Sequence, residues 1–235
     1  MLAPWLWQCS FPDAAWFFLI INGLIVLLSV ILWILVRKVF SSQPVFDHVR
    51  PINLSDVVMT CGAVVMNAIV SLGGWWGWKA GYFSLAALSW ERVLFDFVAM
   101  LVLMDVGMYV THRLAHIPVI YDIVHRRHHD HTETNALSLF VLSPLEVLGF
   151  GTLLVGVTAL VGPCEAGLSA YLAMNLIVGT IGHAGVEPLP RRWLMRLPLG
   201  LLGTSTFHAR HHADRNHNFG FYTTIWDRLC RTLGD

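Results

Sequence analysis

Histidines gather in three short motifs of this chain, and their spacing is regular. "HRLAH" at 112–116 is an i, i+4 pair, while "HRRHH" at 125–129 and "HARHH" at 208–212 are i, i+3, i+4 triplets. On a helix, residues three and four positions apart lie on one side, about a turn from each other. Each motif can therefore direct its imidazoles toward one volume, and imidazole is a good ligand for zinc, copper, iron and nickel.

The number of histidines indicates two metal ions rather than one. A zinc site is closed by four protein ligands, or by three and a water molecule. Together with a further histidine at the end of a predicted membrane segment, the three motifs exceed what one ion can use and suit two ions, each with an open position for a reactant. The predicted ligands are His112, His116, His125, His128, His129, His183, His208, His211 and His212.

Acidic residues near the motifs are expected to support the ligand rings. Two divalent ions bound only by neutral imidazoles leave about four positive charges uncompensated, and carboxylates that accept from ring N–H groups orient the rings. His131 and His217 fall outside the repeated spacing and are expected to have a supporting or surface role, whereas the remote His48 is expected to bind no metal. The candidate acids are Asp105, Asp122, Asp130, Glu133, Asp214 and Asp227.

Several other chemistries lack the residues that they need. A zinc protease of the H-E-x-x-H type requires a glutamate where "HRLAH" has Arg113. A bis-histidine haem site requires opposed single histidines within membrane segments, whereas here the histidines cluster at the ends of the predicted segments. The four cysteines are far apart and form no C-x-x-C pair, which argues against structural zinc and iron–sulfur sites, although a disulfide between Cys9 and Cys164 remains an alternative. The formal net charge of zero provides no field to recruit nucleic acid.

The composition is typical of a membrane protein. Apolar residues make up 56% and charged residues 13% of the chain, against roughly 45–50% and about 25% in soluble domains. A spanning helix needs about 20 apolar residues, and the uncharged stretch at 15–36 supplies them. Further segments are predicted at 56–76, 93–110, 144–162 and 166–183. Because Asn67 and the Gly73-Gly74 pair interrupt the second segment, it could instead form two re-entrant pieces, so four or five spans fit.

The distribution of basic residues predicts the orientation in the membrane. With the N-terminus outside, every lysine and arginine except Lys79 and Arg92 falls in a cytoplasmic segment, as the positive-inside rule requires. All the predicted ligands then lie at the cytoplasmic face. We therefore expect an all-α integral membrane bundle, one domain over 1–235, with a histidine-rich helical cap and the C-terminus in the cytoplasm.

Asp96 and Asp105 lie within an apolar segment, which makes each a candidate functional residue.

These motifs resemble the fatty acid hydroxylase superfamily, which includes the sterol desaturases. The resemblance rests on "DVGMYVTHRLAH" (105–116), "HRRHH" (125–129), "SPLE" (143–146), "GHAGVEPLP" (182–190) and "TSTFHARHHADRNHNFGFYTTIWDRL" (204–229), and it covers about 105–231. It implies two iron ions bound by the nine histidines, with zinc as a substitute in purified protein. Glu187 stands where some members have another histidine, which leaves the coordination of one ion open.

The resemblance also implies an activity. With dioxygen as co-substrate and two electrons, such a centre hydroxylates or desaturates a C–H position of a sterol-type or fatty-acyl lipid in lipid biosynthesis. The sequence has no dinucleotide-binding motif after a strand, so a separate ferredoxin or cytochrome b5-type donor with its reductase is expected, and no side chain beyond the metal centre is expected to be catalytic. The alternative is a non-enzymatic membrane protein that binds or transports a transition metal. A transporter should distribute its ligands through the membrane depth.

Overall fold

The computed structural model describes residues 3–194, 196 and 199–234, and this part of the chain is helical, without a β-strand. Two isolated β-bridges, Pro44 with Val186 and Leu202 with Thr223, join loops. The elements, in chain order, are α1 (Ala3–Gln8), α2 (Phe11–Val39), α3 (Leu54–Lys79), α4 (Trp90–Ala115), α5 (Pro118–Val124), α6 (Arg126–His129), η1 (Ser138–Phe140), α7 (Pro144–Val161), α8 (Glu165–Gly182), α9 (Arg191–Leu194), η2 (Leu199–Leu201), α10 (Ser205–Ala213) and α11 (Ile225–Cys230).

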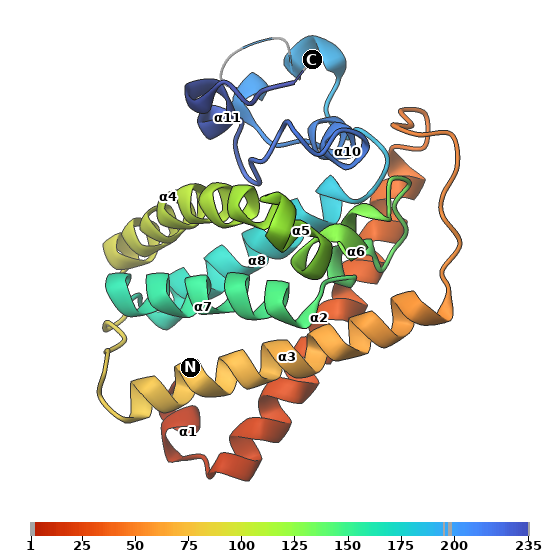
Figure 1. The fold of residues 1–235 in the computed structure, drawn as a ribbon. Coiled ribbons are helices and arrows are strands. Elements are labelled where there is room, and N and C mark those ends of the chain that lie inside the picture. The colour runs from red at the N-terminus through yellow and green to blue at the C-terminus, as the bar shows by residue number, and fades with distance from the viewer. Residues whose placement is uncertain (1–2, 195, 197–198, 235) are drawn as a thin grey trace.

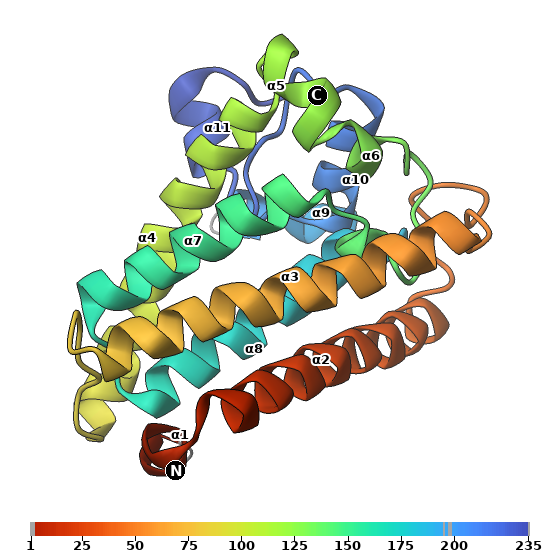
Figure 2. The ribbon, with the colours of Figure 1, turned by 60° about the horizontal axis from the view of Figure 1, so that its bottom comes forward.

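Five long helices form a bundle, and the short helices cover one of its ends. Helix α4 packs against α7 and α8, α2 packs against α3 and α8, and α3 packs against α7. Figure 1 shows α5, α6, α10 and α11 gathered at the end of the bundle where the C-terminus lies. Figure 2 shows α1 and the N-terminus at the opposite end. We call the described segments outside the bundle, 116–143, 183–194, 196 and 199–234, the cap.

Local signals explain where the long helices begin and end. Asn53 and Asp56 form a capping box at the start of α3, in which each side chain accepts from the backbone N–H of the other. Ser143 caps α7, and Gly162, with φ of 56°, ends it in the left-handed conformation that glycine favours. Helix α3 is continuous through Asn67 and the two glycines, so the re-entrant alternative does not form.

Four of the five bundle helices, α2, α3, α4 and α7, are long and apolar enough to cross a membrane. Large apolar side chains such as Leu27 and Leu28 of α2 are more than half exposed on the bundle surface, where lipid would cover them. The fifth predicted span is present as the helix α8 but is not among the four. Glu165 and Asn175 reduce its apolar character, and it packs against both α2 and α4, so protein covers part of its surface.

Asp96, a charged residue within an apolar segment, has structural partners in the bundle. Asp96 of α4 pairs with Arg92 at 2.8 Å and accepts from the backbone N–H of Cys164 at 2.7 Å. A Cβ at Gly167 would lie 2.6 Å from the Cβ of Asp96, so only glycine permits this approach of α8 to α4. Cys9 and Cys164 are both free, so the disulfide considered above does not form.

Candidate metal centre

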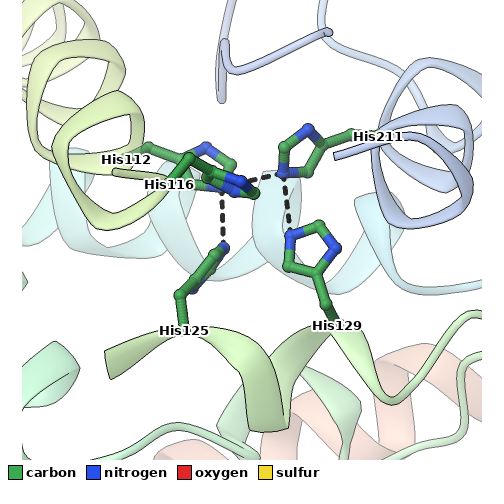
Figure 3. A group of neighbouring side chains, drawn as sticks. All are labelled: His112, His116, His125, His129 and His211. Carbon is green, nitrogen blue, oxygen red and sulfur yellow. Dashed lines mark hydrogen bonds between the residues drawn. The ribbon is translucent and has the colours of Figure 1, made fainter. Parts of the chain in front are cut away.

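The nine predicted ligands meet at the end of the bundle that the cap covers, where they form two groups. The five-histidine group contains His112, His116, His125, His129 and His211, and the four-histidine group contains His128, His183, His208 and His212. Within each group the candidate ligand nitrogens all lie within 4.8 Å of one another. Figure 3 shows the five rings of the first group pointing toward one another from the end of α4, from α6 with its N-cap, and from α10.

The two triplets divide their rings between the groups in a reciprocal way. In "HRRHH" the i and i+4 rings, His125 and His129, join the five-histidine group, and the i+3 ring, His128, joins the other. In "HARHH" the i and i+4 rings, His208 and His212, join the four-histidine group, and the i+3 ring, His211, crosses over. Each triplet therefore contributes to both groups, which holds the two groups side by side.

The hydrogen bonds of the rings show which nitrogens are free to bind a metal. Carbonyl oxygens can only accept, so the Nδ1 atoms of His112, His183 and His211 must carry hydrogens and donate to Phe219 at 2.8 Å, Gly179 at 2.8 Å and His217 at 2.6 Å. A neutral imidazole that donates through Nδ1 has a lone pair on Nε2. The Nε2 atoms of these rings are therefore acceptors without hydrogens.

These lone pairs face one another at short distances. The Nε2 atom of His211 lies 3.0 Å from that of His112. The Nε2 atom of His183 lies 3.2 Å from that of His128, whose Nδ1 atom lies 3.3 Å from the carbonyl oxygen of Val141. Two facing lone pairs repel unless a cation lies between them. Nitrogens bound about 2.0–2.1 Å from one metal ion lie about 3.0–3.4 Å apart. The donor set therefore fits a metal ion in each group, and imidazole suits iron and zinc alike.

His116 supports the same assignment. Both of its ring nitrogens are buried, and neither has a hydrogen-bond partner in the described residues. Its ring lies with centroid distances of 4.8 Å from each of His125, His129 and His211. A buried nitrogen without a partner costs free energy, and a shared metal ion would remove that cost.

The surroundings of the buried rings in the two groups favour their neutral form. Burial, followed by the neighbouring imidazoles, holds the pKa of His128, His208 and His212 well below the usual value for histidine. Burial likewise lowers the pKa of His129 to about 3. Because only the neutral imidazole can bind a metal, this environment keeps the ligands ready for one.

A carboxylate does support a ligand ring, but it is none of the predicted acids. The Nδ1 atom of His125 lies 2.5 Å from Oε1 of Glu146, and both side chains are buried. Glu146 is the last residue of "SPLE" at 143–146, and Ser143 places it in the first turn of α7. The motif was part of the family resemblance, but nothing in its spacing identified His125 as the partner.

The predicted acids lie elsewhere in the described structure. Asp105 accepts from the backbone N–H and the hydroxyl of Thr223, at 3.1 and 2.6 Å, and from the indole N–H of Trp226 at 2.9 Å. Asp122 and Asp130 are exposed beside Arg126 and Arg127, and Glu133 is also exposed. In the described part of the chain none of these four acids forms a hydrogen bond or ion pair with a ring of either histidine group.

Asp227 and the segment around His217 act on the rings through the backbone. Asp227 accepts from the N–H groups of Phe219 and Gly220 at 2.9 and 2.7 Å, and it thereby fixes the loop whose Phe219 carbonyl accepts from His112. The side chain of His217 pairs with exposed Asp214 at 3.0 Å, while its carbonyl accepts from His211. Asp227 and His217 were among the predicted supporting residues, but the roles of the carbonyls were missed because any residue can offer a carbonyl.

His131 and Glu187 both have partners other than the ligand groups. His131 lies 3.2 Å from Asp56 of α3 and 2.8 Å from the hydroxyl of Ser138, so it ties the cap to the start of α3. The carboxylate of Glu187 accepts from the backbone N–H groups of Thr206 and Leu189. Glu187 therefore holds the first turn of α10. Since it is not a member of the second group, that group consists of His128, His183, His208 and His212.

A cavity of about 460 Å³ opens onto both groups. Its walls come from α2, α3, α4, α7 and α8 and are mainly apolar, and its inner end contains His112 and His125 of one group and His128, His183 and His208 of the other. This volume is in the range of ligand-binding cavities in proteins. A bound molecule would therefore have its apolar part among the bundle helices and one end at the histidines.

Comparison with known proteins agrees with the site. The family model described as fatty acid hydroxylase matches residues 97–232, a segment that contains all nine histidines. The chain belongs to the fatty acid hydroxylase family, an iron-dependent kind of hydroxylase. The similarity that the motifs indicated is thus confirmed, and the helical bundle gives it a membrane setting.

Its relatives carry several activities in their names. A cholesterol 25-hydroxylase-like protein of Danio rerio is 30% identical over 67% of this chain and 63% of its own length. A Delta(7)-sterol 5(6)-desaturase of Eremothecium gossypii is 23% identical over 80% of this chain and 54% of its own. A very-long-chain aldehyde decarbonylase, GL1-1, of Oryza sativa subsp. indica is 29% identical over 53% of this chain and 21% of its own. The chain thus spans less than two thirds of these relatives, and no solved structure matches it.

Proposed function

We propose that this protein is a membrane-bound, dioxygen-using oxidoreductase that hydroxylates or desaturates a C–H position of a lipid of the sterol or fatty-acyl type. The observation that carries the proposal is the apolar cavity that ends at both histidine groups. The relatives support it, because their names describe a hydroxylase, a desaturase and a decarbonylase of apolar molecules.

The nine histidines would hold two iron ions, which when bound supply the activation of dioxygen and the oxidation of an unactivated C–H bond. Zinc would occupy the same nitrogens in purified protein but is redox-inactive. The chain itself supplies neutral ligands in fixed orientations. Glu146 holds His125 in place through its Nδ1 atom, and the carbonyls of Phe219, Gly179 and His217 do the same for three other rings.

The cavity walls would position the lipid and exclude water. The apolar lining of the cavity includes Met104 and Met108 of α4 and Leu154 of α7. A dry, apolar wall protects a reactive oxidant from side reactions with solvent. In this proposal no side chain acts as a nucleophile or a general acid, so the residues contribute binding, orientation and the exclusion of water.

Electrons would come from a separate ferredoxin or cytochrome b5-type protein with its reductase. The side chains of Arg126 and Arg127 are 63% and 69% exposed beside the ligands of α6, and Arg210 and Arg215 of the α10 region are also exposed. Positive charge around a docking surface increases the rate of association with an acidic partner. By the positive-inside rule this surface, with the C-terminus, would face the cytoplasm.

The proposal is tested by metal content and oxygen consumption of purified protein in detergent. We expect about two irons per chain after anaerobic loading, and oxygen consumption that requires both a lipid and a reductant. His128→Ala should lower the iron content and abolish turnover, because it removes one of four ligands of its group. His48→Ala is the matched control, since His48 is exposed and outside both groups, and it should behave as the wild type.

A flux measurement in proteoliposomes, combined with the oxygen assay, separates the enzyme from a metal transporter. If the protein moves iron or zinc across proteoliposome membranes and consumes no oxygen with any lipid and reductant, the enzymatic proposal is wrong. The gathering of the ligands at one end of the bundle favours the enzyme, because a transport path needs ligands through the membrane depth.

A further inference from the structure

Three asparagines line the otherwise apolar cavity. Asn22 belongs to α2, Asn67 to α3 and Asn175 to α8, so each comes from a different bundle helix. An amide removed from water without a hydrogen-bond partner costs free energy, and the cost is greatest at membrane depth, where no water can satisfy it. Three amides around one cavity, each with at least one polar atom unbonded, need an explanation beyond packing.

The hydrogen bonds of two of these amides leave complementary groups free. The amide nitrogen of Asn22 donates to the carbonyl of Phe18 at 2.8 Å, which leaves its oxygen as an acceptor. The amide oxygen of Asn175 accepts from the hydroxyl of Tyr222 at 2.5 Å, which leaves its nitrogen as a donor. Asn67 has neither atom bonded within the described residues. The cavity thus offers one acceptor and one donor whose orientation is fixed by a second bond.

These two amides lie at a similar depth. Helices α2 and α8 run in the same direction toward the cap (Figure 2), and a hydrogen bond of 2.8 Å between Ser29 and Thr180 sets their register. Asn22 precedes Ser29 by seven residues and Asn175 precedes Thr180 by five, which places them about 10 and 8 Å before that pair. From Asn175 to His183 at the end of α8 the helix rises about 12 Å.

Away from the histidine groups, the cavity has no basic side chain that could bind an acidic group. Among the described residues that line it there is no lysine or arginine, and Glu146, the acidic member, is bonded to His125. A carboxylate or phosphate at the depth of the asparagines would be buried without a cation beside it, at a large cost. A hydroxyl both donates and accepts, so it is an uncharged group that can pair with the free oxygen of Asn22 or with the free nitrogen of Asn175.

We propose that Asn22 and Asn175, with Asn67 beside them, form a polar subsite that recognises an uncharged hydroxyl group of the lipid. The inference rests on the proposed function and narrows its substrate class. The substrate is a neutral lipid alcohol rather than a free fatty acid or a phospholipid, and its reacting carbon lies roughly 12 Å from the hydroxyl, the rise of α8 between Asn175 and His183.

The test is equilibrium binding of tritiated probes to the purified, metal-loaded protein in detergent. Two matched pairs differ only in the hydroxyl, octadecanol with octadecane and cholesterol with cholestene, and stearate is the charged probe. We expect each alcohol that fits the cavity to bind roughly tenfold more tightly than its hydrocarbon, the effect of one or two net hydrogen bonds. Stearate should bind more weakly than octadecanol.

The variants locate the effect. Asn22→Leu and Asn175→Leu are nearly isosteric, and each should bring the affinity ratio of alcohol to hydrocarbon close to one while metal content stays that of the wild type. Thr158→Val is the control, because it removes a hydroxyl from the membrane helix α7 at a buried position that does not line the cavity, and it should keep the tenfold ratio.

Three results would overturn the subsite: equal binding of alcohol and hydrocarbon by the wild type in both pairs, tighter binding of stearate than of octadecanol, or an unchanged ratio in both asparagine variants. Failure of the proposed function looks different. In that case the hydroxyl preference is present, but the iron-loaded protein consumes no oxygen with any bound lipid.

Discussion

At the scale of the residue, the ligand rings depend on one carboxylate and several carbonyls. Glu146 is the acid that contacts a ligand ring in the described structure, and most of the other rings with a bonded Nδ1 donate to backbone carbonyls. Groups that hold the second nitrogen of a metal-binding histidine fix its tautomer and direction and increase its basicity. The carboxyl partner of His125 should therefore matter more than its distance from the metal suggests.

Glu146→Ala should lower metal affinity about 10- to 100-fold, the usual effect of removing such a partner. Glu146→Gln should lower it less, because the amide oxygen can still accept from Nδ1 of His125. Metal content after dialysis against graded chelator concentrations measures the effect. Asp130→Ala is the control, since Asp130 is exposed and should leave the content unchanged. An alanine variant at 146 with wild-type metal content would show that the contact is incidental.

The gathering of nine histidines at one site could be predicted from the sequence, but their division into two groups could not. Spacings of three and four residues predict rings on one side of a helix, and all nine predicted histidines do lie in the two groups. The crossing of His128 and His211 to the opposite groups depends on how α6 and α10 face each other. The partner of His125 likewise comes from the packing of α7, twenty-one residues away, and no local spacing encodes that.

At the scale of the element, α4 carries both a ligand pair and the attachment of the C-terminal part of the cap. Asp105 lies two helical turns before His112 and accepts three hydrogen bonds from Thr223 and Trp226. Asp227 then fixes the loop that orients His112. The charged residue that looked costly in an apolar segment therefore serves as the connection between a membrane helix and the cap.

Asp105→Ala should destabilise the C-terminal part of the cap, because it leaves the donors of Thr223 and Trp226 without a partner, at about 1–3 kcal/mol each where they are buried. Limited proteolysis in detergent should show faster cleavage after α10, with the α2 and α3 region still protected. Asp122→Ala, at an exposed position on α5, serves as the reference. Equal cleavage of the two variants would contradict this role.

The long helices were predictable because their signals are local and strong. Apolar runs fixed their existence, and caps such as Asn53 and Ser143 fixed their starts. The short helices of the cap were not predictable in the same detail. Helix α6 has four residues, too few to be stable alone, and it forms because tertiary contacts and the shared site hold it.

At the scale of the whole molecule, the site joins segments that are far apart along the chain. The ring contacts of His112 with His211 and of His129 with His211 span 99 and 82 residues, and the same groups include α4, α6, α8 and α10. A metal that binds only the folded state stabilises it by mass action. The two ions would therefore act as the crosslink between the bundle and the cap.

Metal removal should loosen the cap while the bundle stays folded. After dialysis against a strong chelator, we expect hydrogen exchange to increase in 116–143 and 199–232 and to change little in α2 and α3, which contribute no residue to either histidine group. Reloading with zinc should restore protection, since zinc uses the same nitrogens without redox chemistry. Uniform exchange over the whole chain after chelation would show that the bundle depends on the metals as well.

The position of α10 along the chain has a consequence for the order of events during synthesis. Its three histidines follow every bundle helix in the sequence, yet each group needs at least one of them. Domains begin to fold while the ribosome is still at work, so the bundle helices can enter the bilayer while the site is still missing ligands. Metal ions could occupy both groups fully only after insertion, and a chain interrupted before α10 would form the membrane bundle with two incomplete histidine groups.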